Sequence, residues 1–415
     1  MGVKPGYKRT EVGVIPKEWE VAHLGTQLSE PIRNGYSPVC PEQVTGRWML
    51  SLSAVSADGF KTAGVKPAPS HDPRVDDNLL TEGDLLVSRS NTPDRVGLAG
   101  VYEGHPAPCA YPDLLMRVRL KRSLDRYFLL RCLLSPRGRK FFADNARGSS
   151  GSMVKIDRAI LESFPIPTPP LMEQRAIATA LSDVDALLTQ LDRLIAKKRD
   201  IKQAVMQELL TGKTRLPGFG GEWVNGRLDE VALVDPESLS GSTEPDYSFN
   251  YISLENVARG TLVGYSEELF ASAPSRARRV IRHVDILVST VRPNLKSHLL
   301  FRAKPGAWIC STGFSVIRCR PEIAHPEFVF QHLFADNITK QIDALLTGSN
   351  YPAINSSDVR GLTIPIPSIE EQTAIATLLS DLDAELAALE ARRDKTRALK
   401  QGMMQELLTG RTRLV

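Results

Sequence analysis

EQRAIATALSDVDALLTQLDRLIAKKRDIKQAVMQELLTGKTRL, at residues 173–216, returns 198 positions later as EQTAIATLLSDLDAELAALEARRDKTRALKQGMMQELLTGRTRL, at residues 371–414. The two stretches align without a gap, and 27 of their 44 positions are identical. Identity of this extent at a fixed offset indicates an internal repeat. The chain is therefore expected to contain two structurally equivalent parts.

Each of these stretches predicts one long helix with a narrow apolar seam. Apolar residues recur in alternating steps of four and three, which is the spacing of a coiled coil. Proline-rich segments precede both helices, and Gly212 and Gly410 follow them as expected cap residues. The seam consists of Ile177, Leu181, Val184, Leu188, Leu191 and Ile195 in the first copy and of Ile375, Leu379, Leu382, Leu386 and Leu389 in the second.

An apolar seam on an otherwise polar helix needs a partner helix, and the other copy is the obvious one. We therefore expect the two helices to pair antiparallel as an intramolecular coiled coil. The alternative is that they are ordinary core helices of two similar domains. A length of about 40 residues argues against this, because helices in globular proteins average roughly 10–14 residues.

The remaining two segments also resemble each other, though faintly. GDLLVSRSNTP at residues 83–93 and VDILVSTVRPN at residues 284–294 each predict a buried strand that runs into a polar loop. Strand patterns alternate with helical patterns in both segments, so each is expected to form an α+β (mixed α/β) domain. The predicted divisions are two globular domains at residues 1–165 and 213–364 and two helical segments at residues 166–212 and 365–415.

The order of these parts is circular. KRTEVGVIPKEW near the start aligns with KTRLPGFGGEW, the passage after the first helix, and the tail TGRTRLV stops where that passage would continue. The end of the second helix thus leads back to the beginning of the chain. With antiparallel helices, this order predicts a pseudo-twofold molecule whose two globular domains are joined by the long helices.

Composition permits a nucleic-acid partner without requiring one. The 415 residues are 42% hydrophobic and 24% charged, with a net charge of +4. Residues 1–165 hold 23 Lys and Arg against 18 Asp and Glu, whereas residues 213–364 hold sixteen of each. No apolar run approaches the ~20 residues of a membrane span, and the start lacks a signal-peptide core. The five cysteines have no metal-ligand spacing, so we expect a cytoplasmic, reducing environment and no metal site.

Motifs of common catalytic chemistry are incomplete in this sequence. Gly212-Lys213-Thr214 resembles the end of a phosphate-binding loop, but Gln207 stands where that loop needs glycine. Thr168-Pro169-Pro170-Leu171 lacks the flanking residues of an amino-methyltransferase motif, and a proline-rich helix entry explains it better. Pro112-Asp113 has no nearby acidic-x-Lys partner of the kind found in metal-dependent nucleases. We therefore expect no catalytic residues and no cofactor in this chain.

Polar and basic loops remain as candidates for DNA binding. They offer Arg, Asn and Lys side chains of the kind that contact base edges, beside Ser and Lys suited to phosphates. The alternative is that these are solvated turns rich in Asn, Ser and Gly. Their recurrence at equivalent points of both halves favours a shared role. The candidates are Arg33, Asn34, Tyr36, Ser37, Arg89, Ser90, Asn91 and Lys155 in the first half and Arg292, Asn294, Lys296, Ser349, Asn350 and Tyr351 in the second.

Several of these strings together resemble the specificity subunit of a type I restriction-modification system, and the resemblance covers essentially the whole chain. The helix-entry strings are its most specific part. The matching strings are GVIPKEWE (13–20), IRNGYSP (32–38), LSAVSADG (52–59), GDLLVSRSNTPDRVGLAG (83–100), GSSGSMVKI (148–156), PIPTPPLMEQRAI (165–177), PIPSIEEQTAI (365–375) and the repeated ELLTG.

The resemblance implies a non-catalytic reader of double-stranded DNA. Each globular domain would be a target-recognition domain for one half of a bipartite sequence, and the coiled coil would hold the domains about one DNA turn apart. Two modification subunits would bring the S-adenosylmethionine site that methylates a flipped adenine. Restriction subunits, which use ATP and Mg²⁺, would join that core. All these cofactors are expected in the partner subunits.

Divergence between the globular halves predicts an asymmetric target with two different half-sites. Two other functions stay open at this point. A free-standing restriction endonuclease or methyltransferase of the fused kind would cleave or methylate DNA without partners. A coiled-coil scaffold without a DNA role would show no salt-sensitive binding to duplex, whereas a reader that neutralises phosphates should weaken steeply with salt.

Overall fold

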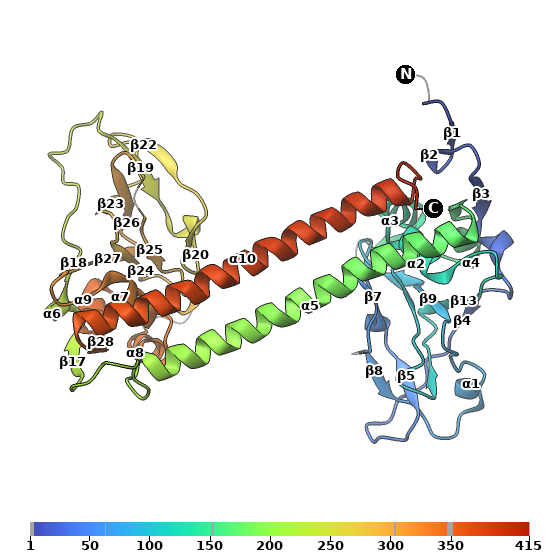
Figure 1. Ribbon diagram of the computed structural model, residues 1–415, viewed down its shortest axis with the longest axis horizontal. Coiled ribbons are helices and arrows are strands. Elements are labelled where there is room, and N and C mark those ends of the chain that lie inside the picture. The colour runs from blue at the N-terminus through green and yellow to red at the C-terminus, as the bar shows by residue number, and fades with distance from the viewer. Residues whose placement is uncertain (1–3, 63, 151–152, 303, 347–351, 415) are drawn as a thin grey trace. The chain divides into compact units, whose positions relative to one another are not determined.

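A computed structural model describes residues 4–62, 64–150, 153–302, 304–346 and 352–414 (Figure 1). The chain divides into two compact units. Unit 1 consists of Met1–Asp192 and Arg392–Val415, and unit 2 consists of Arg193–Ala391. This division runs through the two long helices, whereas the sequence places its boundaries at their ends, so the division into four segments stays a prediction. The mixed α and β composition of both halves is confirmed.

The two long helices are present as the repeat predicts. Helix α5 spans Leu171–Leu209 and helix α10 spans Ile369–Leu407, with 39 residues each. Gly212 and Gly410 follow with φ angles of 69° and 66°, in the left-handed region that favours glycine at a helix end. Each unit therefore contains a part of both helices.

Within each unit the two helices run antiparallel. In unit 1, Asp185 on α5 pairs with Lys400 on α10 at 2.5 Å. In unit 2, Lys198 pairs with Glu385 at 2.7 Å and Lys202 pairs with Asp383 at 2.5 Å. From pair to pair the residue number rises on α5, from 185 to 198 to 202, and falls on α10, from 400 to 385 to 383. This is the order expected of antiparallel helices. Apolar residues complete the packing: Ile177 and Leu181 join Met404, Leu407 and Leu408 in unit 1, and Ile375 and Leu379 join Met206, Leu209 and Leu210 in unit 2.

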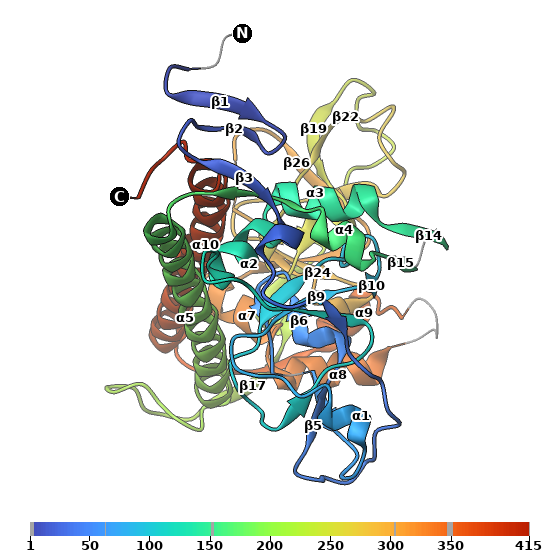
Figure 2. The ribbon, with the colours of Figure 1, turned by 90° about the vertical axis from the view of Figure 1, so that its right-hand side faces the viewer.

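Unit 1 is built on a four-stranded antiparallel sheet in the order β11-β9-β13-β4. Apolar residues of this sheet pack against Phe128 and Phe142 of the covering helices α2 and α3 (Figure 2). The main elements are β4 (Arg33–Asn34), β9 (Leu85–Ser88), β11 (Ala99–Val101), β13 (Leu115–Val118), α2 (Arg126–Leu134) and α3 (Pro136–Asn145).

Smaller elements surround this sheet. One three-stranded sheet has the order β12-β5-β8, and another has the order β10-β15-β14. The elements are β1 (Tyr7–Thr10), β2 (Gly13–Pro16), β3 (Glu20–His23), η1 (Leu24–Gln27), β5 (Trp48–Leu50), η2 (Leu52–Ala54), β6 (Val55–Ser56), β7 (Gly59–Phe60), β8 (Val65–Pro67), α1 (Pro73–Asp76), β10 (Ser90–Asn91), β12 (Cys109–Ala110), β14 (Arg147–Ser150), β15 (Met153–Lys155), α4 (Arg158–Glu162) and β16 (Pro165–Thr168).

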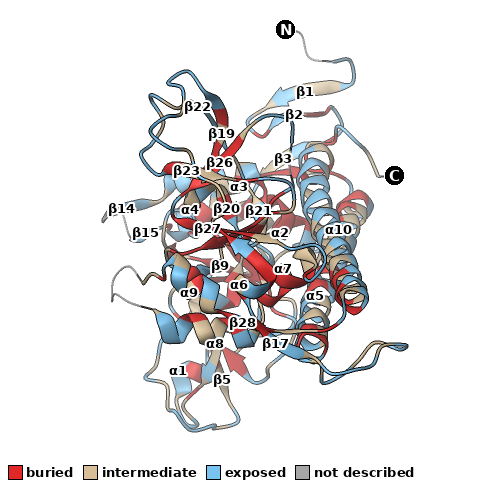
Figure 3. Ribbon diagram, turned by 90° about the vertical axis from the view of Figure 1, so that its left-hand side faces the viewer, coloured by how far each residue is buried: buried red, intermediate tan, exposed pale blue. Residues whose placement is uncertain are grey.

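Unit 2 repeats the four-stranded sheet in the order β18-β27-β24-β25 and adds a second one in the order β22-β19-β26-β23. In Figure 3, β27 and α7 are largely buried. The elements are β17 (Val224–Arg227), α6 (Leu228–Val231), β18 (Ala232–Val234), β19 (Ser248–Ile252), η3 (Leu254–Asn256), β20 (Val257–Ala258), β21 (Thr261–Leu262), β22 (Ser266–Leu269), β23 (Ala277–Val280), β24 (Ile286–Ser289), η4 (Pro293–Leu295), β25 (Leu299–Leu300), β26 (Trp308–Ser311), β27 (Phe314–Cys319), α7 (Pro326–His332), α8 (Asp336–Leu345), α9 (Ser356–Gly361) and β28 (Thr363–Ile366).

Buried glutamines fix the start of each long helix in the same way. Gln174 accepts a hydrogen bond from the Asp125 amide at 2.8 Å, and its amide group donates to the carbonyls of Ser123 and Pro169. Gln372, 198 residues later, accepts from the His325 amide at 2.8 Å and donates to the carbonyls of Ile323 and Pro367. Equal bonding of equivalent residues shows that the two halves share one scaffold.

A buried carboxylate completes each helix start and joins distant parts of the chain. In unit 2, Glu371 accepts hydrogen bonds from Arg215 at 2.6 Å and from the Trp223 indole at 3.3 Å. In unit 1, Glu173 accepts from Trp19 at 3.2 Å and from Arg413, which the C-terminal tail supplies. The tail therefore contributes to unit 1 what the passage after α5 contributes to unit 2, as the circular order predicts.

Candidate nucleic-acid interface

Polar loops of unit 1 leave the central sheet at one edge, where β13 begins. Strands β9 and β4 both run antiparallel to β13 and end beside its first residues. The Arg89 amide donates to the Leu114 carbonyl at 2.8 Å, and the Gly35 amide donates to the Leu115 carbonyl at 3.3 Å. Residues 35–37 and 89–91, which hold most of the first-half candidates, therefore lie at the same edge of the sheet.

Loop 1, which we define as residues 89–95, is held by strand β15. Ser90 lies opposite Lys155 and Asn91 lies opposite Val154, and the Ile156 amide donates to the Arg89 carbonyl at 2.9 Å. The structure thus brings together four predicted residues: Arg89, Ser90, Asn91 and Lys155. Lys155 is exposed and Asn91 is half-buried, whereas Ser90 is only 1% exposed and its side chain lies in the interior.

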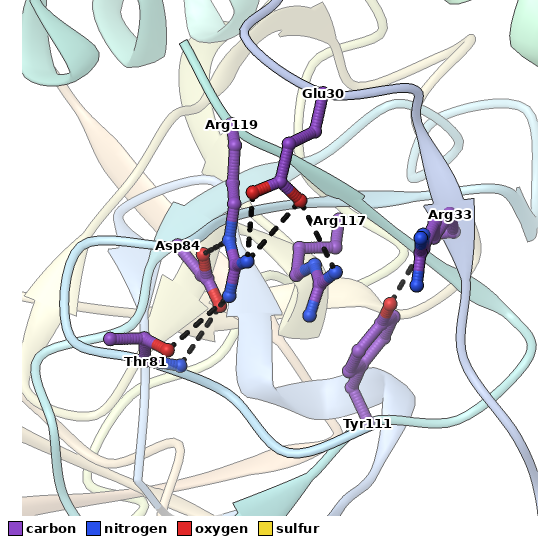
Figure 4. Close-up of polar contacts among 7 residues, drawn as sticks. All are labelled: Glu30, Arg33, Thr81, Asp84, Tyr111, Arg117 and Arg119. Carbon is purple, nitrogen blue, oxygen red and sulfur yellow. Dashed lines mark hydrogen bonds and ion pairs between the residues drawn. The ribbon is translucent and has the colours of Figure 1, made fainter. Parts of the chain in front are cut away.

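Two of the other first-half candidates, Tyr36 and Ser37, contact other side chains. The guanidinium of Arg74 lies 4.1 Å from the centre of the Tyr36 ring, and the Ser37 hydroxyl donates to Asp113. Arg33 is exposed on β4, and its carbonyl accepts from the Tyr111 hydroxyl at 3.4 Å (Figure 4). The side-chain oxygen of Asn34 is buried without a hydrogen-bond partner among the described residues.

Loop 1 borders a cavity of about 770 Å³ that is also lined by Val55 and Ser56 of β6. Its apolar wall includes Leu98 and Leu134, and its polar wall includes Asn91, Arg95 and Arg139. Arg139 donates to the Asp94 carbonyl at 3.1 Å, while its Nη1 is buried without a partner in the described structure. Burial lowers the pKa of Arg139, yet a guanidinium stays charged in proteins. The cavity therefore offers a cation and an amide beside an apolar surface.

Loop 2 of unit 2, which we define as residues 290–296, has the same main-chain anchors. The Thr290 amide donates to the Gly313 carbonyl at 2.9 Å, and the Ile354 amide donates to the Thr290 carbonyl at 2.9 Å. Val291 lies opposite Ala353. These bonds correspond one by one to those of loop 1.

The candidates of loop 2 lie around the short helix η4. Arg292 and Lys296 flank it in the left-handed region, with φ angles of 47° and 53°. Asn294 is exposed on it, and the Lys296 ammonium donates to the Phe334 carbonyl at 3.2 Å. Lys296 also lines a cavity of about 620 Å³, together with Arg259 of the hairpin β20–β21. Ser349, Asn350 and Tyr351 lie outside the described residues.

The opposite edge of each sheet is held by an arginine that pairs with a buried aspartate, and Figure 4 shows the cluster of unit 1. In unit 1, Arg119 bonds to Asp84 at 2.6 Å and to Glu30 at 3.2 Å. The hydrogen bonds that Arg119 donates to the Asp84 carboxylate are the main cause that raises the pKa of Arg119. Since Asp84 is 3% exposed, this cluster positions strands and is not part of the exposed interface.

Unit 2 contains the same charge cluster. Arg318 bonds to Asp285 at 2.9 Å and to Glu237, and Asp285 is the main cause that raises the pKa of Arg318. Asp84 and Asp285 occupy equivalent positions in the similar stretches 83–93 and 284–294, whereas their arginine partners lie outside these stretches. The two clusters show that the sheets beneath loops 1 and 2 are built alike.

Other chemistry can be assessed only for the part of the chain that the structure describes. There, no group of three or more His, Cys, Asp or Glu side chains could hold a metal ion. The five cysteines are free, and burial raises the pKa of Cys109 and Cys132 to about 12. Among these residues, every helix is too short or too polar to cross a lipid bilayer.

Comparisons with known proteins all point to one family. Residues 70–202 and 284–397, together more than half of the chain, match the type I restriction modification DNA specificity domain. The type I restriction enzyme MjaVIII specificity subunit of Methanocaldococcus jannaschii is 22% identical over 422 residues, which cover 96% of this chain and 94% of that protein.

Solved structures share the fold. A chain from a study of complex assembly and conformational transition of the type I R-M system has a TM-score of 0.57 at 18% identity, and the match covers 95% of this chain and 99% of that one. A type I restriction-modification system S subunit from M. genitalium has a TM-score of 0.58 at 15% identity, with 98% of each chain covered.

Proposed function

Because this chain belongs to the family of type I restriction-modification specificity subunits, we propose that it reads a split, asymmetric DNA sequence, with one half-site for each unit. Loops 1 and 2 are the parts that face the bases. The long helices form the coiled coil that carries both units, and the chain itself performs no catalysis.

One observation carries this proposal: the two loops have the same main-chain anchors but different side chains. Arg89 and Thr290 donate equivalent bonds to the carbonyls of Leu114 and Gly313, the residues just before strands β13 and β27, and both accept from an isoleucine amide. These shared main-chain anchors would place each loop in the same way on duplex DNA, whose backbone is regular. Unlike side chains at equal positions would then select unlike sequences, because base edges in the major groove differ in their donors and acceptors.

Partner subunits complete the activity in this proposal. Two modification subunits supply S-adenosylmethionine and the catalytic groups for adenine methylation, and restriction subunits supply the Mg²⁺- and ATP-dependent steps. The observation that favours two modification subunits is the duplicated helix start, with Gln174 and Gln372 in the same hydrogen-bond pattern. Equivalent surfaces on one chain can bind two copies of one partner.

The proposal is tested by co-expressing this chain with a modification subunit from the same genome in a host without adenine methylation. Long-read sequencing then maps the methylated adenines. The expected result is one split motif with two unlike halves. A palindromic motif, or methylation without sequence preference, would contradict the proposal.

Two further measurements separate the alternatives. The purified chain alone should neither methylate nor cleave DNA when it is given S-adenosylmethionine and Mg²⁺; either activity would indicate an enzyme of the fused kind. The complex should bind duplex with an affinity that falls steeply as salt rises. Absence of any salt-sensitive binding would indicate a scaffold.

A further inference from the structure

The shared anchors of loops 1 and 2 define which residues are equivalent. Arg89 corresponds to Thr290, since the two amides donate to the turns that precede β13 and β27 and both carbonyls accept from an isoleucine amide. Ser90 corresponds to Val291, because Ser90 lies opposite Lys155 and Val291 lies opposite Ala353, 198 residues later.

The next position holds Asn91 in loop 1 and Arg292 in loop 2. Asn91 pairs with Val154, and the Arg292 amide donates to the Pro352 carbonyl at 2.8 Å. Asn91 is half-buried and Arg292 is exposed. Among the loop positions matched by these main-chain bonds, this is the one at which both units carry a side chain able to make two hydrogen bonds to one base.

These two side chains differ in the base that they suit. An asparagine amide matches the N6 donor and N7 acceptor of adenine, whereas a guanidinium matches the O6 and N7 acceptors of guanine. We infer that Asn91 reads an adenine in one half-site and that Arg292 reads a guanine at the corresponding place of the other. This inference rests on the proposed function.

The surroundings of Asn91 are suited to this role. Its side-chain oxygen accepts from the Thr92 amide at 2.9 Å, which fixes the amide plane. The NH₂ group and a second lone pair of the oxygen can still bond to a base. Lys155, which lies opposite Ser90 on the neighbouring strand, is exposed. Ser90 and Val291 cannot serve as readers in the same way, because Ser90 is buried and Val291 has no polar group.

Reciprocal substitutions test the inference in the complex with the modification subunit. Asn91→Arg should change one adenine of its half-site to guanine and leave the other half-site unchanged. Arg292→Asn should change one guanine of the other half-site to adenine. Matched controls are Asn145→Arg at the exposed end of α3 and Arg320→Asn in the exposed loop after β27, which should leave the methylated motif as it is.

An unchanged motif in active Asn91→Arg or Arg292→Asn complexes would overturn the inference, as would a change in both half-sites. Absence of any split motif from the unsubstituted complex would instead refute the proposed function. The two failures are therefore distinguishable.

A binding measurement covers the case in which the Asn91→Arg complex is inactive. Each adenine of the half-site is replaced in turn by 7-deazaadenine, which lacks the N7 acceptor. The unsubstituted complex should lose affinity at one position, by less than the roughly 10- to 100-fold of a whole bidentate contact, because the bond to N6 remains. Asn91→Ala, which removes both bonds, should bind normal DNA roughly 10- to 100-fold less tightly and show no further loss at that position. The inference would be overturned if 7-deazaadenine weakened binding by the Asn91→Ala complex at the same positions and by the same factors as for the unsubstituted complex.

Discussion

Arg413 donates a hydrogen bond to Glu173 at 2.7 Å, although the two residues are 240 positions apart. Glu173 is 1% exposed, and Arg413 is its ion-pair partner. The same bond links Arg215 to Glu371 in unit 2 across 156 positions. The C-terminal tail therefore belongs structurally to the first half of the chain, and the ion pairs of Arg413 with Glu18 and Glu173 close the repeat.

Removal of this arginine should destabilise unit 1. Arg413→Ala leaves the buried Glu173 carboxylate with the Trp19 indole as its one remaining side-chain partner among the described residues, and an uncompensated buried charge costs about 3 kcal/mol. Chemical denaturation of the full chain measures the loss. The matched control is Arg411→Ala, because Arg411 pairs with Glu406 on the exposed surface. Equal stability of both variants would contradict this account of the tail.

A buried histidine should make unit 2 sensitive to acid. His332 is 1% exposed, and burial lowers its pKa to about 3. The unfolded chain binds a proton there near pH 6.5, while the folded chain does not. The free energy of unfolding therefore keeps the contribution of the neutral ring above pH 6.5 and loses it as the pH falls toward 3. At pH 5 the loss is about 2 kcal/mol.

The repeat supplies the matched substitution for this histidine. Phe128 and Phe328 occupy the same place in α2 and α7, so Cys132 stands in unit 1 where His332 stands in unit 2. His332→Cys should remove about 2 kcal/mol of the loss in unfolding free energy between pH 7.5 and pH 5. His71→Ala, at an exposed position, is the control and should not change that loss. A pH dependence unaltered by His332→Cys would show that the ring is not the cause.

Lys155 should contribute affinity without sequence preference, since an ammonium beside loop 1 suits a phosphate. Lys155→Ala should weaken duplex binding and reduce the slope of log K against log salt by about 0.9, the value for one phosphate contact. The methylated motif should stay the same. Lys140→Ala on α3, where Lys140 pairs with Asp144, is the control. A changed motif would mean that Lys155 reads a base.

The long helices and the strands before the loops could be predicted from the sequence because their signals are local. A seam of spaced apolar residues marks α5 and α10, and the strings containing Leu85–Ser88 and Ile286–Ser289 mark β9 and β24. Each of these patterns occurs in both halves of the chain, and this recurrence strengthens the prediction of the element.

Contacts between distant residues could not be predicted in the same way. Arg119 and Asp84 are 35 positions apart, while their counterparts Arg318 and Asp285 are 33 apart. Because the two separations differ, alignment of the two halves does not reveal the pair. The burial of Ser90 was equally hidden, because a serine in a polar string looks like a surface residue. The pairing of Ser90 with Lys155 depends on a strand 65 positions away.

The most direct test of the central claim, that each repeat reads its own half-site, is a chain with two first repeats. Residues 1–223 would be followed by a second copy of residues 20–212 and then by residues 411–415, which keeps Arg215, Trp223 and Arg413 for the two buried glutamates. Methylated adenines are mapped for this chain with its modification subunit. The account predicts a motif whose halves are both the half-site read by unit 1. A motif that retains the other half-site, or one in which the half-site of unit 1 is absent, would contradict it.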